Sequence, residues 1–171
     1  MKAPVFESTR FRLIPFTKSE SKIFHEINTD KFVRKFLWDN ESITLSLAKE
    51  MLMRNERYFL DDKFGLWKII LNNTEIIGYA GLWYFFNEPQ PQLIYVLLKD
   101  YTGKGYATEA SKIIINYAFT KLQFQYLVAA IDEPNITSQK VAERLGMKFF
   151  RTKKINNNPL LFYRIDKINT R

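Results

Sequence analysis

The chain has 171 residues, 46% of them hydrophobic and 16% aromatic, which excludes an intrinsically disordered protein and suffices for one substantial core. It contains no cysteine, so disulfides, thiolate metal sites and a cysteine nucleophile are excluded, and a cytoplasmic location is compatible. No signal segment and no apolar span of membrane length is apparent. We therefore expect one soluble domain over residues 1–171 with no membrane partner.

The 26 Lys and Arg residues outnumber the 18 Asp and Glu residues, giving a formal net charge of +8. The excess of positive charge is greatest near the C-terminal end. There the only acidic residue is Asp166, and the basic residues are Lys148, Arg151, Lys153, Lys154, Arg164, Lys167 and Arg171. Such a region can serve a nucleic acid, a ribosome, an acidic substrate or a phosphorylated cofactor. A solvated, lysine-rich surface is the simpler explanation, so a nucleic acid is not the expected partner.

The N-terminal part of the chain predicts one strand followed by helices. In order, we expect a strand over Arg10–Phe16, a helix after a capping box at Thr17–Glu20, a short aromatic helix and loop over Lys31–Asn40, and a helix capped by Ser42 or Thr44 and reaching about Leu60. His25 is the only histidine. Without cysteine or a second histidine it cannot anchor a metal cluster, so we expect no metal site.

The remainder alternates strands and helices. We expect a hairpin of Leu66–Leu71 and Glu75–Phe85, a strand at Leu93–Leu98, a helix from about Ala107 to Phe119, a strand at Gln125–Ile131, a helix at Ile136–Leu145 ended by Gly146, and a strand pair of Phe149–Ile155 and Leu160–Ile165. An antiparallel meander that feeds one strand–helix–strand unit indicates an α+β or mixed α/β fold.

Two glycines separate the strand at Leu93–Leu98 from the helix that follows, in the segment Thr-Gly-Lys-Gly-Tyr-Ala-Thr-Glu-Ala at Thr102–Ala110. The first turn of a helix presents backbone N–H groups without internal partners, and the helix dipole makes that end positive. Glycines let a large anion approach the backbone, so the arrangement suits a phosphate or pyrophosphate. An ordinary tight turn is the alternative, which two glycines alone do not exclude.

Two nucleotide-binding motifs with related physics do not fit this segment. A Walker A loop requires Gly-x-x-x-x-Gly-Lys-Ser/Thr, which the sequence lacks. A dinucleotide-binding fingerprint requires a third glycine where Thr108 stands and an acidic residue about 20 positions further on, whereas Asp132 lies later. A hairpin also precedes the segment, so a Rossmann fold is disfavoured.

Four ordered segments resemble the GNAT superfamily of N-acetyltransferases, and in particular its branch of ribosomal-protein N-terminal acetyltransferases (RimJ/RimL-like). The segments are Glu7–Pro15, Ile76–Leu82, Gly103–Ala110, and Asn135–Ser138 with Arg144–Met147. The resemblance extends over nearly the entire chain. The resemblance implies a GNAT-like fold with a mixed central sheet, an antiparallel N-terminal meander, splayed central strands and flanking helices.

The resemblance also implies acetyl-CoA as co-substrate and assigns site residues. Tyr95, Val96 and Leu97 fall where the family's central strand bulges and splays, so that its backbone pairs with pantetheine and one N–H polarises the thioester carbonyl. The pyrophosphate would be held by Thr102, Gly103, Lys104, Gly105, Tyr106, Ala107 and Thr108. Asn135 would contact pantetheine, and Ser138 would contact coenzyme A and protonate its departing thiolate.

Several positions depart from the family pattern. Thr102 replaces a Gln or Arg, and Gln92 stands where the branch often has a Glu. Ala130 and Ala142 occupy positions where some relatives carry a Glu base and a Tyr acid. No carboxylate base is therefore assigned by motif. Glu88 is the nearest acidic candidate for the general base. One alternative is that Glu88 is only a solvated loop residue, and that a chain of water molecules removes the proton of the amine instead.

The sequence thus predicts an acetyl-CoA-dependent N-acetyltransferase in which a primary amine attacks the thioester directly in a ternary complex. The sequence does not decide whether the acceptor is a protein N-terminus or a small-molecule amine. It also does not decide whether the protein forms a homodimer. Aromatic side chains either line the acceptor pocket or belong to the core: Phe36, Trp38, Trp83, Tyr84 and Phe85. The alternatives are a coenzyme A-binding sensor or pseudoenzyme and a basic module associated with ribosome or RNA.

Overall fold

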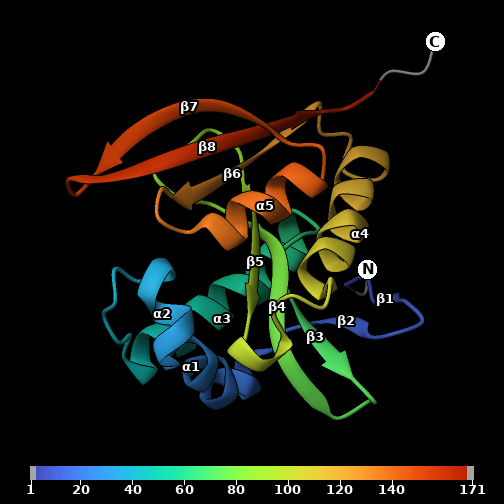
Figure 1. Ribbon diagram of the computed structural model, residues 1–171. Coiled ribbons are helices and arrows are strands. Elements are labelled where there is room, and N and C mark those ends of the chain that lie inside the picture. Colours follow the sequence, from blue (N-terminus) through green and yellow to red (C-terminus); the bar gives the residue numbers. More distant parts are fainter. Residues whose placement is uncertain (1–2, 169–171) are drawn as a thin grey trace.

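Two antiparallel sheets form the framework of the computed structural model, which describes residues 3–168 (Figure 1). The first has the order β1 (Phe6–Glu7), β2 (Arg12–Pro15), β3 (Leu66–Leu71), β4 (Glu75–Trp83) and β5 (Gln92–Leu97). The second has the order β6 (Tyr126–Asp132), β8 (Asn158–Asp166) and β7 (Lys148–Ile155). The expected meander and terminal strand pair are confirmed, and β1 is a short addition that the sequence did not predict.

Helices cover both faces of the first sheet. They are α1 (Ser21–Thr29), α2 (Lys31–Leu37), α3 (Leu45–Asp61), α4 (Tyr106–Thr120) and α5 (Ile136–Arg144), with short 3₁₀ helices η1 (Lys18–Glu20) and η2 (Lys99–Tyr101). One core, around Phe16, Phe24 and Leu52, joins the sheet to α1 and α3. The other, around Trp67 and Ile114, joins it to α4. Because both faces are covered, all six residues of β3 are buried, and its sequence shows no polar alternation.

The two sheets meet at β5 and β6, which the helix α4 connects. Each strand is hydrogen-bonded within its own sheet, and no ladder joins the two strands. The splayed central strands are therefore confirmed. The bulge expected at Tyr95–Leu97 is wrong, because the β4–β5 pairing runs without a shift from Gly78–Leu97 to Trp83–Gln92. The irregularity lies instead between Ile69 and Ile70 of β3.

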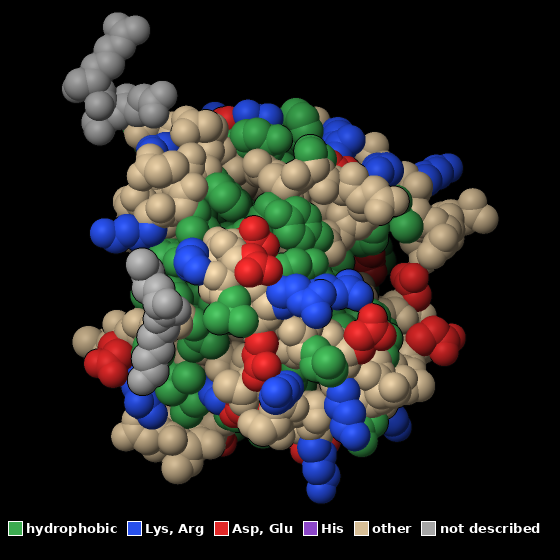
Figure 2. Space-filling view, turned by 180° about the vertical axis from the view of Figure 1, so that it is seen from behind, with side chains coloured by type: hydrophobic (Ala, Val, Ile, Leu, Met, Phe, Trp, Pro, Cys, Tyr) green, Lys and Arg blue, Asp and Glu red, His purple; other side chains and the backbone are tan. Residues whose placement is uncertain are grey.

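Charges are distributed over the surface without one dominant cluster on the face shown in Figure 2, where basic and acidic side chains are interspersed. Part of the C-terminal basic excess is paired: Arg151 with Glu88 and Arg164 with Asp166, at 2.6 and 2.5 Å. Arg171 lies outside the described residues. Between residues 3 and 168, no helix combines the length and apolarity needed to cross a bilayer.

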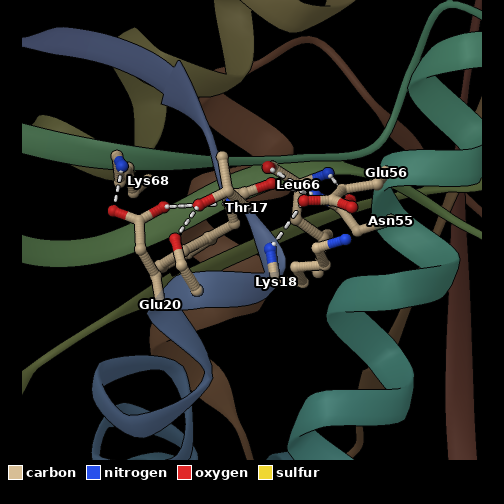
Figure 3. A network of polar contacts seen from close by, with 9 residues as sticks. Thr17, Lys18, Glu20, Asn55, Glu56, Leu66 and Lys68 are labelled. Atoms are coloured by element: carbon tan, nitrogen blue, oxygen red, sulfur yellow. Dashed lines mark hydrogen bonds and ion pairs between the residues drawn. The ribbon is translucent and has the colours of Figure 1, made fainter.

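A polar network attaches α3 to the first sheet (Figure 3). The fully buried Asn55 donates from Nδ2 to the Phe16 carbonyl at 2.9 Å, and its Oδ1 accepts the Leu66 N–H at 2.7 Å. Beside it, the carboxylate of Glu20 accepts the Thr17 N–H at 2.9 Å, as the capping-box spacing predicts, and pairs with Lys68. Asn55 thus supplies hydrogen bonds that the backbone lacks where the chain enters β3 and leaves β2.

We expect Asn55→Ala to lower the free energy of unfolding by about 2–4 kcal/mol, because a buried N–H and a buried carbonyl each lose their partner. Urea unfolding measures this loss. Arg54→Ala is the matched control on the same helix, since its ion pair with Glu50 at 3.1 Å is exposed, and its removal should cost about 0.5 kcal/mol or less. Equal losses in the two variants would contradict the assigned role.

Candidate active site

A cavity of about 420 Å³ opens between β5 and β6, where the two sheets separate. Its walls come from α2, from the loop after β4, from β5 and β6, from the glycine loop before α4, and from α5. Ten predicted cofactor residues line it: Tyr95, Val96, Leu97, Thr102, Gly103, Gly105, Ala107, Thr108, Asn135 and Ser138. The lining does not include Lys104 or Tyr106. Segments far apart in the sequence thus meet at one site.

Strand register decides which backbone groups of β5 face this cavity. The Leu98 N–H donates to the Ile77 carbonyl at 2.9 Å, so even-numbered residues of β5 exchange hydrogen bonds with β4. The N–H and C=O groups of Tyr95 and Leu97 therefore point toward β6, which forms no ladder with β5. By the same rule, Val96 directs its backbone at β4 and offers the cavity only its side chain. Tyr95 and Leu97 can hydrogen-bond a ligand that lies along β5 as an added strand.

The glycine loop ends at the first turn of α4. Gly103 and Gly105 both have positive φ, at 73° and 83°, and Gly105 is the N-cap residue of this helix of 15 residues. A cap without a side chain leaves the first N–H groups of α4 accessible from the cavity. Since these groups also lie at the positive end of the helix dipole, the loop can bind an anion such as a pyrophosphate.

Arg10 holds this loop from the turn between β1 and β2. Its Nη1 donates to the Lys104 carbonyl at 2.9 Å, and its Nε donates to the Glu109 carboxylate at 2.8 Å. The guanidinium also lies 4.5 Å from the centre of the Tyr106 ring. These contacts explain what Lys104 and Tyr106 do outside the cavity lining: they connect the loop to Arg10, a residue to which the sequence analysis assigned no role at the site.

The start of α5 forms the opposite wall. Asn135 is its N-cap, and the Asn135 Oδ1 accepts the Ser138 N–H at 3.2 Å. Asn135, and not Ser138, therefore caps the helix, and the Ser138 hydroxyl makes no hydrogen bond to another described residue. The Tyr95 hydroxyl crosses the cavity and donates to the Ser138 carbonyl at 2.8 Å. Burial raises the pKa of Tyr95, which keeps this hydroxyl protonated as a donor.

Glu88, the candidate base, lies outside the cavity lining. Its side chain is 17% exposed, and its carboxylate oxygen lies 2.6 Å from Arg151 and 3.6 Å from Lys153 of β7. The expectation of a solvated loop residue is therefore wrong. Its carboxylate is engaged by two cations of β7 and does not line the cavity, so the geometry does not favour Glu88 as the base.

The predicted aromatic wall divides into two groups. Phe36, Trp38 and Phe85 line the cavity, together with Phe32 and Phe86, which the sequence did not single out. Trp83 and Tyr84 do not line it. Trp83 is buried in the core beside α3, and Tyr84 packs against the rings of Tyr58 and Phe64. Both groups come from aromatic runs, so composition alone could not separate them.

Four polar residues of the cavity were not assigned a role from the sequence: Gln92, Asp132, Thr137 and Arg144. Asp132 ends β6 and is the one carboxylate among the described residues that line the cavity. Gln92 is 1% exposed, and its Nε2 donates to the Phe85 carbonyl at 3.0 Å while its Oε1 has no partner within the described part of the chain. The available sequence signal for Asp132 was its position at the end of a buried strand, three residues before the Asn135 cap of α5. Between residues 3 and 168, no group of three acidic or histidine side chains could hold a metal.

Comparison with known families shows which family the chain belongs to. A family model described as an acetyltransferase (GNAT) domain matches residues 10–148. The chain belongs to the GNAT family of N-acetyltransferases. It is 25% identical over 140 residues to the uncharacterized N-acetyltransferase YnaD of Bacillus subtilis, a match that covers 81% of this chain and 79% of the relative.

Solved structures share the fold of this acetyltransferase at low sequence identity. The ribosomal-protein-S5-alanine acetyltransferase of Vibrio fischeri superposes with a TM-score of 0.81 at 17% identity, covering 98% of this chain and 99% of that one. The ribosomal L7/L12 α-N-protein acetyltransferase RimL, in complex with coenzyme A, superposes with a TM-score of 0.79 at 17% identity, covering 95% and 98%. The GNAT-like fold expected from the sequence is confirmed, and these neighbours belong to the branch that the motifs resemble.

We expect Arg10→Ala to loosen the glycine loop of this acetyltransferase. Backbone amides of residues 103–106 should exchange with solvent about fivefold faster, equivalent to about 1 kcal/mol, because the lost ion pair is partly exposed. Arg10→Lys should behave similarly, since an ammonium cannot reproduce the two-pronged contact. Hydrogen exchange read by mass spectrometry tests this, with exchange in β3 as the internal control. Unchanged loop exchange would mean that the loop is ordered without Arg10.

Proposed function

We propose that this acetyltransferase transfers the acetyl group of acetyl-CoA to a primary amine by direct attack in a ternary complex. The observation that carries the proposal is the continuous path from unpaired backbone on β5 to the glycine loop at the start of α4. Pantetheine carries two amides that can pair with Tyr95 and Leu97 as a strand would. The backbone amides around Gly103 and Gly105 then bind the pyrophosphate.

The residues present fit such a ligand. The Asn135 Oδ1 is used as the helix cap, and its Nδ2 remains available to a carbonyl of the pantetheine arm. The thioester of acetyl-CoA supplies an activated acyl group. An N–H of β5 aimed at its carbonyl oxygen stabilises the negative charge that develops there, without requiring a side chain. By the register of β5, that N–H belongs to Tyr95 or Leu97.

Direct attack by the amine follows from the nucleophiles that the chain offers. It has no cysteine, and the cavity lining contains no histidine that could activate the hydroxyl of Ser138, Thr102 or Thr108. An acyl-enzyme intermediate therefore has no activated nucleophile to form on. Ser138 is assigned the role of hydrogen-bonding the departing thiolate, which is a fair leaving group and needs little assistance.

A coenzyme A-binding sensor without turnover is the second candidate. It is favoured by Ala130 and Ala142, which offer no proton-transfer group, and by the engagement of Glu88 with Arg151. The acceptor, whether a protein N-terminus or a small amine, the homodimer and the cytoplasmic location remain predictions from the sequence.

Free-thiol release from acetyl-CoA over a panel of amines tests the proposed function. We expect turnover with at least one amine, and an acetyl-CoA-dependent rise in melting temperature, since a ligand that binds only the native state must stabilise it. Stabilisation without thiol release for any acceptor would favour the sensor. Neither stabilisation nor release would overturn the cofactor assignment.

Gly105→Glu should lower the affinity for coenzyme A at least about tenfold, about 1.4 kcal/mol, by placing bulk and negative charge at the first turn of α4. Gly146→Glu is the matched control. Gly146 has nearly the same φ, 81° against 83°, so both substitutions impose similar backbone strain, but Gly146 lies outside the cavity lining. Calorimetric titration compares the two variants. Equal affinities would mean that the anion binds elsewhere.

Ser138→Ala should lower turnover about ten- to a hundredfold, the low end for general acid catalysis, with little change in acetyl-CoA affinity. Because Asn135 caps α5, removing the Ser138 hydroxyl should leave the melting temperature unchanged. Asn135→Ala should instead cost about 1 kcal/mol of stability through the lost cap. Wild-type turnover in Ser138→Ala would remove Ser138 from the mechanism.

A further inference from the structure

We propose that Asp132 binds the ammonium group of the acceptor and takes its proton, in a subsite whose other walls are apolar and aromatic. This inference rests on the proposed function and names the residue and the acceptor class that the motifs left open. The acceptor is a primary amine carried on an apolar body of aromatic size.

Asp132 is the one acidic side chain among the described residues that line the cavity. It pairs with Leu160 in the β6–β8 ladder, two residues beyond the pair of Ala130 with Phe162. Side chains two residues apart on a strand project from the same face, so the carboxylate of Asp132 and the methyl group of Ala130 face the same side of the sheet. The Asp132 carboxylate forms no hydrogen bond or ion pair with another described residue, so a ligand does not have to displace a partner.

The charges around Asp132 leave it available as a proton acceptor. Partial burial raises its pKa to about 6, and the carboxylate of Asp39, from the loop between α2 and α3, adds to the rise. On β7, which β8 separates from β6, the cations Arg151 and Lys153 are engaged by Glu88. Other charged groups nearby are Glu133, which is exposed and follows Asp132 in the chain, and Arg144, which lines the cavity from α5. A carboxylate of this pKa is ionised at neutral pH and still basic enough to accept a proton in a dry site.

The walls near Asp132 are apolar. Phe32 and Phe36 lie one turn apart on α2 and line the cavity, and Phe32 remains 37% exposed. From the other sides, the lining is completed by Trp38, Phe85, Phe86, Ile131 and Leu160. Gln92 contributes its Oε1, which has no partner in the described part of the chain and can accept one N–H of the amine. The Gln92 Nε2 donates to the Phe85 carbonyl. Because a carbonyl requires a donor, this hydrogen bond fixes the orientation of the side-chain amide and leaves Oε1 as the free acceptor.

This lining favours an apolar amine over a peptide N-terminus. The first residues of a peptide present several amide groups beside the amine, and each would need a partner when buried. The walls formed by α2, by the loop after β4, by the first residue of β5 and by the end of β6 offer two polar side chains, Asp132 and Gln92. An ammonium on an aromatic body satisfies both of them and leaves no buried amide unpaired.

The proton balance of the step is complete. The ammonium gives one proton to the Asp132 carboxylate, and the free electron pair of the nitrogen forms the C–N bond to the thioester carbon. The C–S bond breaks, and its electron pair leaves on the sulfur. The second nitrogen proton reaches the thiolate by way of the Ser138 hydroxyl. Asp132 then returns its proton to solvent, so the products are an amide, coenzyme A thiol and one proton.

The first test is binding, which does not require turnover. 2-Phenylethylamine is titrated calorimetrically into protein saturated with coenzyme A. We expect the wild type to bind it, with affinity falling below about pH 6 as Asp132 becomes protonated. Asp132→Asn should bind at least about tenfold more weakly at pH 7.5, with unchanged coenzyme A affinity and melting temperature. Asp132→Glu, which keeps the carboxylate, should retain the pH dependence, and Glu133→Gln, an adjacent exposed control, should match the wild type.

The second test is the pH profile of kcat/KM for the same amine. The wild type should rise through a pKa near 6 and fall above the amine's own pKa, because the reactive pair is the Asp132 carboxylate with the ammonium. In Asp132→Asn only unprotonated amine can react, so kcat/KM should be about 100-fold lower at pH 7 and should climb steadily with pH. A variant profile that keeps the limb near pH 6 would overturn the role of Asp132.

The outcomes separate this inference from the proposed function. Amine binding that depends on Asp132, without thiol release, would support the subsite and overturn catalysis. Turnover with equal rates in wild type and Asp132→Asn would support the acetyltransferase and overturn the inference. A screen that compares 2-phenylethylamine, spermidine and peptides beginning with Ala or Ser tests the acceptor class. Preference for a peptide, retained in Phe36→Ala, would overturn the apolar acceptor.

Discussion

The absence of a ladder between β5 and β6 is the constraint on which the site depends. Two strands connected by a helix would ordinarily pair, yet here each strand completes a different sheet. The separation leaves the backbone groups of Tyr95 and Leu97 without strand partners beside a largely apolar cavity. Unpaired backbone groups in such a place are costly unless water or a ligand satisfies them. The fold therefore creates a slot with the hydrogen-bonding pattern of a missing strand.

Contacts from distant parts of the chain hold this slot open. The Tyr95 hydroxyl donates to the Ser138 carbonyl across it, which keeps α5 at a fixed distance from β5. At the other end, Arg10 fixes the glycine loop through Lys104 and Glu109. Neither contact involves an atom assigned to the chemistry. Both act by positioning backbone groups, which suits a reaction that depends on preorganised amides more than on reactive side chains.

The two halves of the cavity follow different physical rules. The half formed by β5, the glycine loop and the first turn of α5 relies on backbone N–H groups and helix ends, and its sequence signature is glycines at fixed spacing. The half formed by α2, the loop after β4 and the end of β6 relies on side chains. Side chains there can vary without disturbing the backbone, so a shared family predicts the first half well and the second half poorly.

The sequence by itself determined the order of the elements and the loop that surrounds Gly103 and Gly105, because turn chemistry and hydrophobic periodicity are local properties. The resemblance of four ordered segments indicated the family. It also identified Asn135 and Ser138 as neighbours of the site. The tertiary structure decided which of these residues face the cavity, how Arg10 and Tyr95 support it, and why Glu88 lies outside it with Arg151. It also placed Asp132 in the cavity without an ionic partner between residues 3 and 168. These facts depend on strand register and on contacts between segments far apart in the chain, and no local pattern encodes either.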